Sequence, residues 1–200
     1  EMKNKGFDVI NFGTGEPDFD TPLNIKKAGI TAINEGRTKY TPAAGLPELR
    51  EVIAKRLAED CGLSYDTSEI TVASGAKHSV FIALMATVNP GDEVILPAPF
   101  WVSYYELIRM AGGIPVIVTA EEKDGFKISA KQLDEAITDK TKLLILNNPS
   151  NPTGMVYQRN ELEQLAEVCK KRDIYVMSDE IYYGLVYGDA LFTSFATLSD

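Results

Sequence analysis

The sequence predicts an α/β fold in which a mostly parallel β-sheet carries helices on both faces. From residue 69 onward, short apolar runs alternate with longer segments of helical pattern, an order typical of a parallel sheet with right-handed crossovers. The apolar runs are continuous and do not alternate with polar residues, as is expected of strands that are covered on both faces.

Before residue 69 the sequence predicts a short strand and two helices, connected by loops rich in glycine and proline. These elements cover residues 6–11, 22–34 and 46–61. Asp20 or Thr21 is expected to cap the first helix, because short side chains with an oxygen accept from the free N–H groups of a helix start. Gly62 is expected to end the second helix, since glycine readily adopts the left-handed conformation found there.

From residue 69 onward the sequence predicts five strands that alternate with four helices. The predicted strands cover residues 70–73, 93–96, 114–118, 142–146 and 174–177, and the predicted helices cover residues 76–88, 101–111, 129–137 and 159–172. Ser129 is expected to cap the third of these helices. No internal repeat and no low-complexity segment interrupts this order.

Composition and charge limit the function classes that the chain can serve. With 200 residues, of which 44% are hydrophobic and 24% charged, the chain is long enough for one or two globular domains with a real core. A net charge of -9 argues against nucleic-acid partners and anionic membrane surfaces, because both require clustered Lys and Arg. Cys61 and Cys169 form no CxxC pair, and we interpret them as thiols of a cytoplasmic protein.

Polar clusters follow four of the five predicted strands, at the point where each strand ends. They cover residues 74–78, 97–101, 147–154 and 178–182, whereas the third strand is followed by a plain acidic loop. Ligands of open parallel sheets bind beyond the carboxyl ends of the strands. The sequence therefore predicts one ligand site, to which all four clusters contribute.

The first two clusters suit an anion and a flat ring. Gly75 and Ala76 lie where a strand enters a helix, and the free N–H groups of such a turn bind anions such as phosphate. The alternative is a tight turn without a ligand. No P-loop and no GxGxxG string accompanies this turn, so a dinucleotide is poorly supported. Trp101 could stack on a planar cofactor, or it could pack in the core or an interface.

The last two clusters suit a ring that carries a proton and an oxygen. Asn151 could donate to a phenolate or carboxylate oxygen, although its loop could also be only a rigid turn. Asp179 ends a buried strand, where a carboxylate is costly unless a cation or donors meet it; it could hold a proton on a ring nitrogen. Tyr182, three residues later, could donate to a neighbouring ring oxygen. We expect no metal, because His78 is the sole histidine and no ligand spacing accompanies it.

These strings resemble the fold-type I pyridoxal-phosphate enzymes, and more closely the class I aminotransferases of the bacterial aspartate aminotransferase branch. The matching strings cover residues 15–22, 39–50, 73–77, 97–101, 147–154 and 178–182. They occur in the family's order across essentially the whole chain. The resemblance implies pyridoxal 5'-phosphate as cofactor. It also implies an N-terminal segment of the small domain over residues 1–21 and an incomplete cofactor-binding large domain over residues 22–200.

The resemblance implies a role for each cofactor-binding residue. Gly75, Ala76 and Lys77 would open the phosphate-binding helix, and Trp101 would stack on the pyridine ring. The remaining cofactor contacts would come from Asn151 and Tyr182 at the phenolic oxygen, from Asp179 at the pyridinium, and from Tyr40 at the partner subunit's cofactor phosphate. Asp179 and Tyr182 would be the catalytic residues of this chain, because a protonated ring stabilises the carbanion formed from the substrate.

The resemblance also implies the substrate contacts and the limits of this chain. Gly15 would lie against the substrate α-carboxylate, Lys77 would meet a dicarboxylate side chain, and Trp101 and Asn151 would complete the substrate site. The family's Schiff-base lysine follows the segment of Asp179, but no lysine follows position 171 here. We therefore expect a fragment of a longer protein, truncated before that lysine and inactive alone.

The expected activity of the parent protein is transamination of an amino acid, with aspartate as donor and a 2-oxo acid such as 2-oxoglutarate as acceptor. The resemblance implies a cytoplasmic homodimer that serves amino acid biosynthesis. One alternative keeps the fold and changes the reaction, to a β-lyase, a cyclising synthase or an aromatic or prephenate aminotransferase. Another is a non-catalytic anion-binding α/β module.

Overall fold

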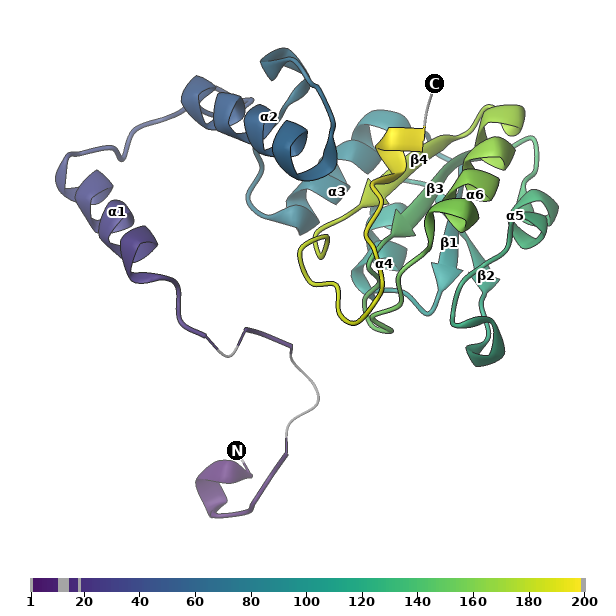
Figure 1. Cartoon of the computed structure of the whole chain (residues 1–200), viewed down its shortest axis with the longest axis horizontal. Coiled ribbons are helices and arrows are strands. Elements are labelled where there is room, and N and C mark those ends of the chain that lie inside the picture. Colours follow the sequence, from purple (N-terminus) through teal and green to yellow (C-terminus); the bar gives the residue numbers. More distant parts are fainter. Residues whose placement is uncertain (1, 11–14, 18, 199–200) are drawn as a thin grey trace. The chain divides into compact units, whose positions relative to one another are not determined.

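The computed structural model describes residues 2–10, 15–17 and 19–198. The chain divides into two compact units, one up to Thr41 and the other from Pro42 onward (Figure 1). The first unit contains a short 3-10 helix, Lys3–Lys5, and the helix α1, Leu23–Asn34. The second unit contains the sheet and the other α-helices, and it holds most of the predicted site.

Two predictions about the first unit are wrong. Pro22 occupies the cap position of α1 and no side chain caps this helix; Asp20, one of the two predicted caps, instead forms an ion pair with Lys26 at 2.7 Å. No strand forms over residues 6–10, and Asn11, the end of the predicted strand, lies outside the described residues. A strand needs a neighbour for its backbone groups, and no described segment pairs with residues 7–10 in this way.

The sheet has four parallel strands in the order β2-β1-β3-β4. They are β1 (Glu93–Ala98), β2 (Ile114–Thr119), β3 (Thr141–Asn147) and β4 (Tyr175–Asp179). These four strands and the parallel α/β class are confirmed. In register, Asn147 at the end of β3 lies beside Asp179 at the end of β4, so the polar residues that follow these strands meet at one edge.

The predicted strand over residues 70–73 does not form. This segment is extended, but it adds no strand to the sheet. Val72 donates its N–H to the carbonyl of Ala44 at 3.0 Å, and a Cβ on Gly45 would come within 2.6 Å of the Val72 side chain. The apolar run is therefore held by close contact with the loop before α2, and not by a ladder of strand hydrogen bonds.

Helices cover both faces of the sheet, as predicted (Figure 1). The α-helices of this unit are α2 (Pro47–Cys61), α3 (Ala76–Thr87), α4 (Ser103–Met110), α5 (Ala130–Ala136) and α6 (Arg159–Arg172), and its 3-10 helices are Thr67–Glu69, Glu122–Asp124 and Phe195–Leu198. Side chains of α3 and α4 pack with Val94 and Leu96 of β1, whereas α5 and α6 pack with Ile95. Successive strand residues thus enter opposite cores, which is the period of two that a strand imposes.

The helix ends agree with the predicted signals in this unit. Gly62 ends α2 in the left-handed conformation, with φ of 71°. Ser129 caps α5: its Oγ accepts from the N–H of Gln132 at 3.2 Å, and Gln132 accepts in return from the Ser129 N–H at 2.9 Å. Within the described part of the chain, no helix is both long and apolar enough to span a membrane.

Candidate functional site

Asp179, the last residue of β4, has a hydrogen-bond donor at each oxygen of its carboxylate. Tyr104 of α4 donates its hydroxyl to Asp179 Oδ2 at 2.6 Å, and the Ile181 N–H donates to Oδ1 at 3.2 Å. The half-buried carboxylate is therefore satisfied without a cationic side chain. The two donors leave both carboxylate oxygens at the carboxyl edge of the sheet, which is an arrangement suited to a cationic ligand group.

Tyr104 remains protonated and is the donor in this pair. The residue is only 2% exposed. Burial raises the pKa of Tyr104 most, and the hydrogen bond and charge of Asp179 raise this pKa further, with a small contribution from Tyr182. Because both burial and a nearby anion disfavour a phenolate, the hydroxyl keeps its proton far above its usual range.

Trp101 connects Tyr104 with the start of α3. Its ring meets the Tyr104 ring edge to face, with centroids 5.3 Å apart and an interplanar angle of 89°. The Lys77 ammonium lies 4.9 Å from the centroid of the Trp101 ring, within the range of a cation–π contact. Trp101 also packs against the core, so the predicted packing interpretation and a stacking role are compatible.

The start of α3 has free backbone donors. Gly75 occupies the cap position with φ of 84° and ψ of 164°, and no side chain caps the helix. His78 Nδ1 accepts from the Ser74 N–H at 3.2 Å and so holds the turn from within. Among the described residues, the N–H groups of Ala76 and Lys77 have no hydrogen-bond partner. These donors and the helix dipole favour an anion at this turn.

The asparagine-rich loop after β3 is fixed by its first two asparagines. Asn147 Oδ1 accepts from the Asn151 N–H at 2.7 Å, and Asn147 Nδ2 donates to the Asp179 carbonyl at 3.0 Å. Asn148 is buried, and its Oδ1 accepts from the Tyr157 N–H at 2.9 Å. The bond from Asn151 uses its main-chain N–H, and no described residue bonds its side-chain amide, so this amide is available to a ligand.

The chain turns directly after Asp179, as a shared orientation of Asp179 and Tyr182 requires. The Tyr183 N–H donates to the Glu180 carbonyl at 2.9 Å. Glu180 Oε1 accepts from Ser178 Oγ, Ser194 Oγ and the Phe195 N–H at 2.7, 3.0 and 2.9 Å. Glu180 therefore attaches the segment at residues 194–195 to the end of β4 through hydrogen bonds.

The described part of the chain has no group of three or more His, Cys, Asp or Glu side chains arranged for a metal.

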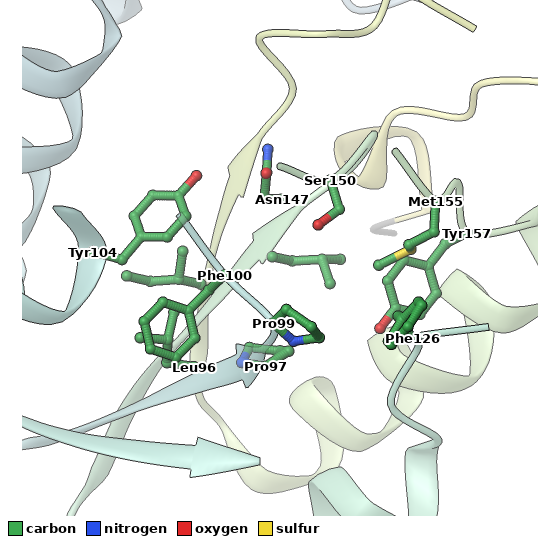
Figure 2. A pocket seen from close by; sticks show the side chains of 12 residues that line it. Leu96, Pro97, Pro99, Phe100, Tyr104, Phe126, Asn147, Ser150, Met155 and Tyr157 are labelled. Atoms are coloured by element: carbon green, nitrogen blue, oxygen red, sulfur yellow. The ribbon is translucent and has the colours of Figure 1, made fainter. Parts of the chain in front are cut away.

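A small cavity of about 20 Å³ lies beneath the same edge. Figure 2 shows Tyr104 and Phe100 on one side of it, Met155 and Tyr157 on the other, and the Ser150 hydroxyl between them. This volume suffices for roughly one water molecule. The cavity is therefore too small for a ring-sized ligand, and neither Asp179 nor Trp101 lines it.

The structure brings together most of the predicted site residues in the second unit, and the other two belong to the first unit. Asp179 is the last residue of β4 and Tyr182 follows this strand, while Trp101 follows β1 and Asn151 follows β3. The start of α3 joins them through the contact of Lys77 with Trp101. Gly15 and Tyr40 belong to the first unit, where both are exposed. The functional roles of all these residues stay predictions.

Sequence reasoning missed two residues of this site, Tyr104 and Asn147. Tyr104 lies three residues after Trp101, a spacing that shares a face once the segment is helical. Asn147 opens the recognised asparagine string and occupies the strand position beside Asp179. Counting along the two strands could have found Asn147, but the partner of Tyr104 lies 75 residues away in sequence.

The groups at this edge fit a ligand that carries a phosphate, a flat ring and a protonated ring nitrogen. The unpartnered N–H groups of Ala76 and Lys77 suit the phosphate, and Trp101 suits the ring. The Asp179 carboxylate, held by two neutral donors, suits the cationic nitrogen. This is the chemistry of pyridoxal phosphate, so the residues present fit the cofactor that the sequence predicts.

The chain is similar in sequence to curated aminotransferases. The aspartate aminotransferase of Geobacillus stearothermophilus is 51% identical over 199 residues, which make up 100% of this chain and 51% of that protein. The aspartate/prephenate aminotransferase of Cereibacter sphaeroides is 50% identical over 195 residues, 97% of this chain and 49% of that protein. This chain spans about half the length of these curated relatives.

A solved structure and a family model give the same assignment. The structure of aspartate aminotransferase from Thermus thermophilus with maleate has a TM-score of 0.95 and 42% identity, and the match covers 98% of this chain and 51% of that chain. Residues 7–200 match the family model described as aminotransferase class I and II. These findings confirm the resemblance that the motifs predict. The chain belongs to the aminotransferase class I and II family.

Proposed function

We propose that the complete protein transfers an amino group between an amino acid and a 2-oxo acid, with pyridoxal 5'-phosphate as its cofactor. The observation that carries this proposal is the Asp179 carboxylate, which has a donor on each oxygen. It shares the sheet edge with Trp101, whose ring contacts Lys77 at the uncapped start of α3. Family membership supports the same reaction class.

The start of α3 binds the cofactor phosphate in this proposal. The N–H groups of Ala76 and Lys77 donate to it, and the positive end of the helix dipole favours its charge. Gly75 has no side chain to obstruct the approach, and open space lies beside it. His78 supports the turn through its bond from the Ser74 N–H.

The residues after β1, β3 and β4 hold the cofactor ring. Trp101 stacks on the ring, while Asn151 and Tyr182 donate to its phenolic oxygen. Asp179 accepts from the ring nitrogen, and an anion at this position raises the pKa of a bound cation by about 1–3 units. When bound, the cofactor supplies the electron sink for the charge left on the substrate when its α-proton is lost.

The proposed donor is aspartate and the proposed acceptor is 2-oxoglutarate, which is supported by the aspartate aminotransferase name of the Geobacillus relative. Gly15 lies against the substrate α-carboxylate, and Trp101 and Asn151 complete the substrate site. Lys77 binds the side-chain carboxylate of the dicarboxylic substrate. Its contact with the Trp101 ring is worth about 0.5–1 kcal/mol at an exposed site, so the ammonium can move to a substrate carboxylate at small cost.

The proposed assembly is a cytoplasmic homodimer that serves amino acid biosynthesis. Residues 1–21 belong to the small domain and residues 22–200 to the large domain, and Tyr40 reaches the cofactor phosphate of the partner subunit. Exposed apolar side chains on α1, among them Leu23, Ile30 and Ile33, support a protein contact on this helix. Free thiols at both cysteines support a reducing compartment.

The test uses protein expressed from its complete gene. Pyridoxal phosphate is titrated and followed by absorbance, and oxaloacetate is measured with coupled malate dehydrogenase after addition of aspartate and 2-oxoglutarate. We expect saturable cofactor binding and oxaloacetate formation that requires both substrates. Binding of inorganic phosphate without binding of pyridoxal phosphate would overturn the proposal in favour of the anion-binding module. Release of ammonia and pyruvate from a donor would favour a β-lyase.

Prephenate is a second candidate acceptor. The Cereibacter relative, 50% identical, is named aspartate/prephenate aminotransferase. The same assay with aspartate and prephenate gives oxaloacetate if this candidate holds. A kcat/KM for prephenate below that for 2-oxoglutarate by more than about 1,000-fold, which is roughly 4 kcal/mol, would remove prephenate as a substrate.

A further inference from the structure

Tyr104, which is buried, and Asp179, which is half-buried, form a phenol–carboxylate pair between α4 and the end of β4. The distance between Tyr104 Oη and Asp179 Oδ2 is 2.6 Å, which is within the short range of hydrogen bonds to an ionised acceptor. We propose that Tyr104 is a positioning residue that fixes the plane of the Asp179 carboxylate for its bond with the cofactor ring nitrogen. This inference rests on the proposed function.

Tyr104 is rigid enough for this role. The residue is 2% exposed and belongs to the core cluster that includes Leu107 and Ile108 of the same helix. The edge-to-face contact with Trp101 limits the tilt of its ring. Since core side chains are close-packed, the hydroxyl is held at one place, and a small change in its environment cannot redirect it.

The Asp179 carboxylate needs such a constraint. The terminal torsion of an aspartate is broad and roughly two-fold, so one hydrogen bond leaves the carboxylate plane free to turn. The Ile181 N–H holds Oδ1 at 3.2 Å, and Tyr104 holds Oδ2 at 2.6 Å. Two donors on different oxygens fix the plane, and each oxygen keeps a lone pair for a third donor.

The direction of donation is also fixed. Burial and the neighbouring Asp179 raise the pKa of Tyr104, so its hydroxyl remains a donor throughout the pH range of the reaction. Two further ionisable groups near this pair are Tyr182, which contributes to the raised pKa of Tyr104, and Lys77, whose ammonium lies over the Trp101 ring. Tyr104 therefore supplies a neutral donor that leaves the negative charge on Asp179.

The contrasting explanation is that the hydroxyl only ties α4 to β4. A matched control separates the two explanations. Tyr157 is 1% exposed and packs in the opposite core, and its hydroxyl accepts from the Ile128 N–H at 2.9 Å. Tyr104→Phe and Tyr157→Phe each remove one buried hydroxyl with a single hydrogen-bond partner, but only the first partner is Asp179.

The experiment uses both variants in protein expressed from the complete gene, loaded with pyridoxal phosphate labelled with ¹⁵N in the ring. Nitrogen NMR at neutral pH reports the protonation of the ring nitrogen. Steady-state assays give kcat and KM for the amino donor, and thermal unfolding gives Tm. For Tyr104→Phe we expect a ring-nitrogen resonance shifted toward that of unprotonated pyridine. We also expect kcat lower by on the order of tenfold, the weight of one hydrogen bond to a charged group, and KM within about twofold.

Tyr157→Phe is expected to lower Tm without moving the resonance or kcat. A Tyr104→Phe protein with the wild-type resonance and kcat, and a Tm lowered as in Tyr157→Phe, would overturn the positioning role. If the wild-type protein binds no cofactor, the proposed function itself fails, so the two failures are distinguishable.

A second measurement compares kcat between variants, so that a loss of stability caused by Tyr104→Phe alone does not decide the outcome. Tyr104→Phe is introduced both into the wild-type protein and into the Asp179→Asn variant. The loss of kcat that it causes is then compared between these two backgrounds. If Tyr104 acts through Asp179, its removal changes kcat by less than about twofold once Asp179 is asparagine, because coupled residues are non-additive. An equal tenfold loss in both backgrounds would show that Tyr104 acts by another route and would overturn the inference.

Discussion

The side-chain amide of Asn147 donates to the main-chain carbonyl of Asp179 at 3.0 Å, from the neighbouring strand position. Its oxygen accepts from the Asn151 N–H at 2.7 Å. One side chain thus ties the end of β4 to the loop that carries Asn151. The strand that presents the carboxylate and the loop that presents the amide are therefore fixed as one unit.

Substitution of Asn147 by Ala removes both bonds. We expect a loss of about 2 kcal/mol in the free energy of unfolding, since each hydrogen bond contributes roughly 1 kcal/mol, together with weaker cofactor binding. Asn160→Ala is the control, because Asn160 is an exposed residue of α6 and exposed substitutions change stability by about 0.5 kcal/mol or less. Chemical denaturation measures the free energy of unfolding of both variants. Equal losses for the two variants would contradict the linking role of Asn147.

Substitution of Gly75 by Ala tests the anion site. Gly75 has φ of 84°, and no atom lies within 4 Å of an added Cβ, so the cost is one of backbone strain, about 1–3 kcal/mol. Gly62→Ala is matched in this respect, with φ of 71° and open space, but it lies at the end of α2. Both variants lose stability, and Gly75→Ala alone weakens cofactor binding by about tenfold or more. Isothermal titration measures the affinity; the same affinity in both variants would refute the site at α3.

Substitution of Glu180 by Ala tests the attachment of Ser194 and the 3-10 helix Phe195–Leu198 that follows it. One carboxylate oxygen accepts from Ser178, Ser194 and the Phe195 N–H, and bonds to a charged acceptor are worth about 1.5–3 kcal/mol each. We expect faster hydrogen exchange at Phe195 and its neighbours, with Glu180→Gln intermediate. Glu135→Ala, on the exposed face of α5, leaves this exchange unchanged. Unaltered exchange in Glu180→Ala would rule out the proposed attachment.

Buried phenols predict a loss of stability at alkaline pH. Burial raises the pKa values of Tyr104 and Tyr157 above the ordinary value of 10.0. Above about pH 10 the unfolded chain releases these protons and the folded chain keeps them, so stability is complete below that pH and falls as the pH rises. The slope is about 1.4 kcal/mol per pH unit for each tyrosine. Burial also raises the pKa of Cys169 to about 11, which adds a loss of the same sign from about pH 9.

Urea denaturation of Tyr104→Phe and Tyr157→Phe between about pH 10 and pH 11 checks this prediction. In each variant the free energy of unfolding should fall less steeply with pH than in the wild-type protein, because one tyrosine no longer contributes to the slope. Parallel curves for the wild-type protein and both variants would mean that neither phenol is protonated beyond its usual range in the folded state.

Most strands of the sheet could be predicted from the sequence, but the segment at residues 70–73 was wrongly predicted to be a strand. Residues 93–98 and 141–147 form strands because continuous apolar runs between polar turns fit a sheet covered on both faces. Residues 70–73 have the same local pattern, but their backbone is held by the loop at Ala44. Whether an apolar run joins a sheet depends on a neighbour in space, which local periodicity does not contain.

The candidate site divides in the same way. Asp179, Trp101 and Asn151 could be predicted because each follows a strand, and parallel strands bring their carboxyl ends to one edge. Tyr104 could not be predicted, because its contact depends on the rotation of α4 about its axis and on a partner from a distant strand. The predicted cap at Asp20 failed because Pro22 took the cap position of α1.

The most direct test of the central claim is the kcat of Asp179→Asn in the complete protein. Asparagine keeps the shape and can still accept from Tyr104, but it removes the charge that would hold a proton on the ring nitrogen. We predict that kcat falls by roughly 100-fold or more, as a loss of about two pKa units of bias requires, while Asp139→Asn at an exposed position has the wild-type kcat. A kcat for Asp179→Asn within about twofold of wild type would contradict the account.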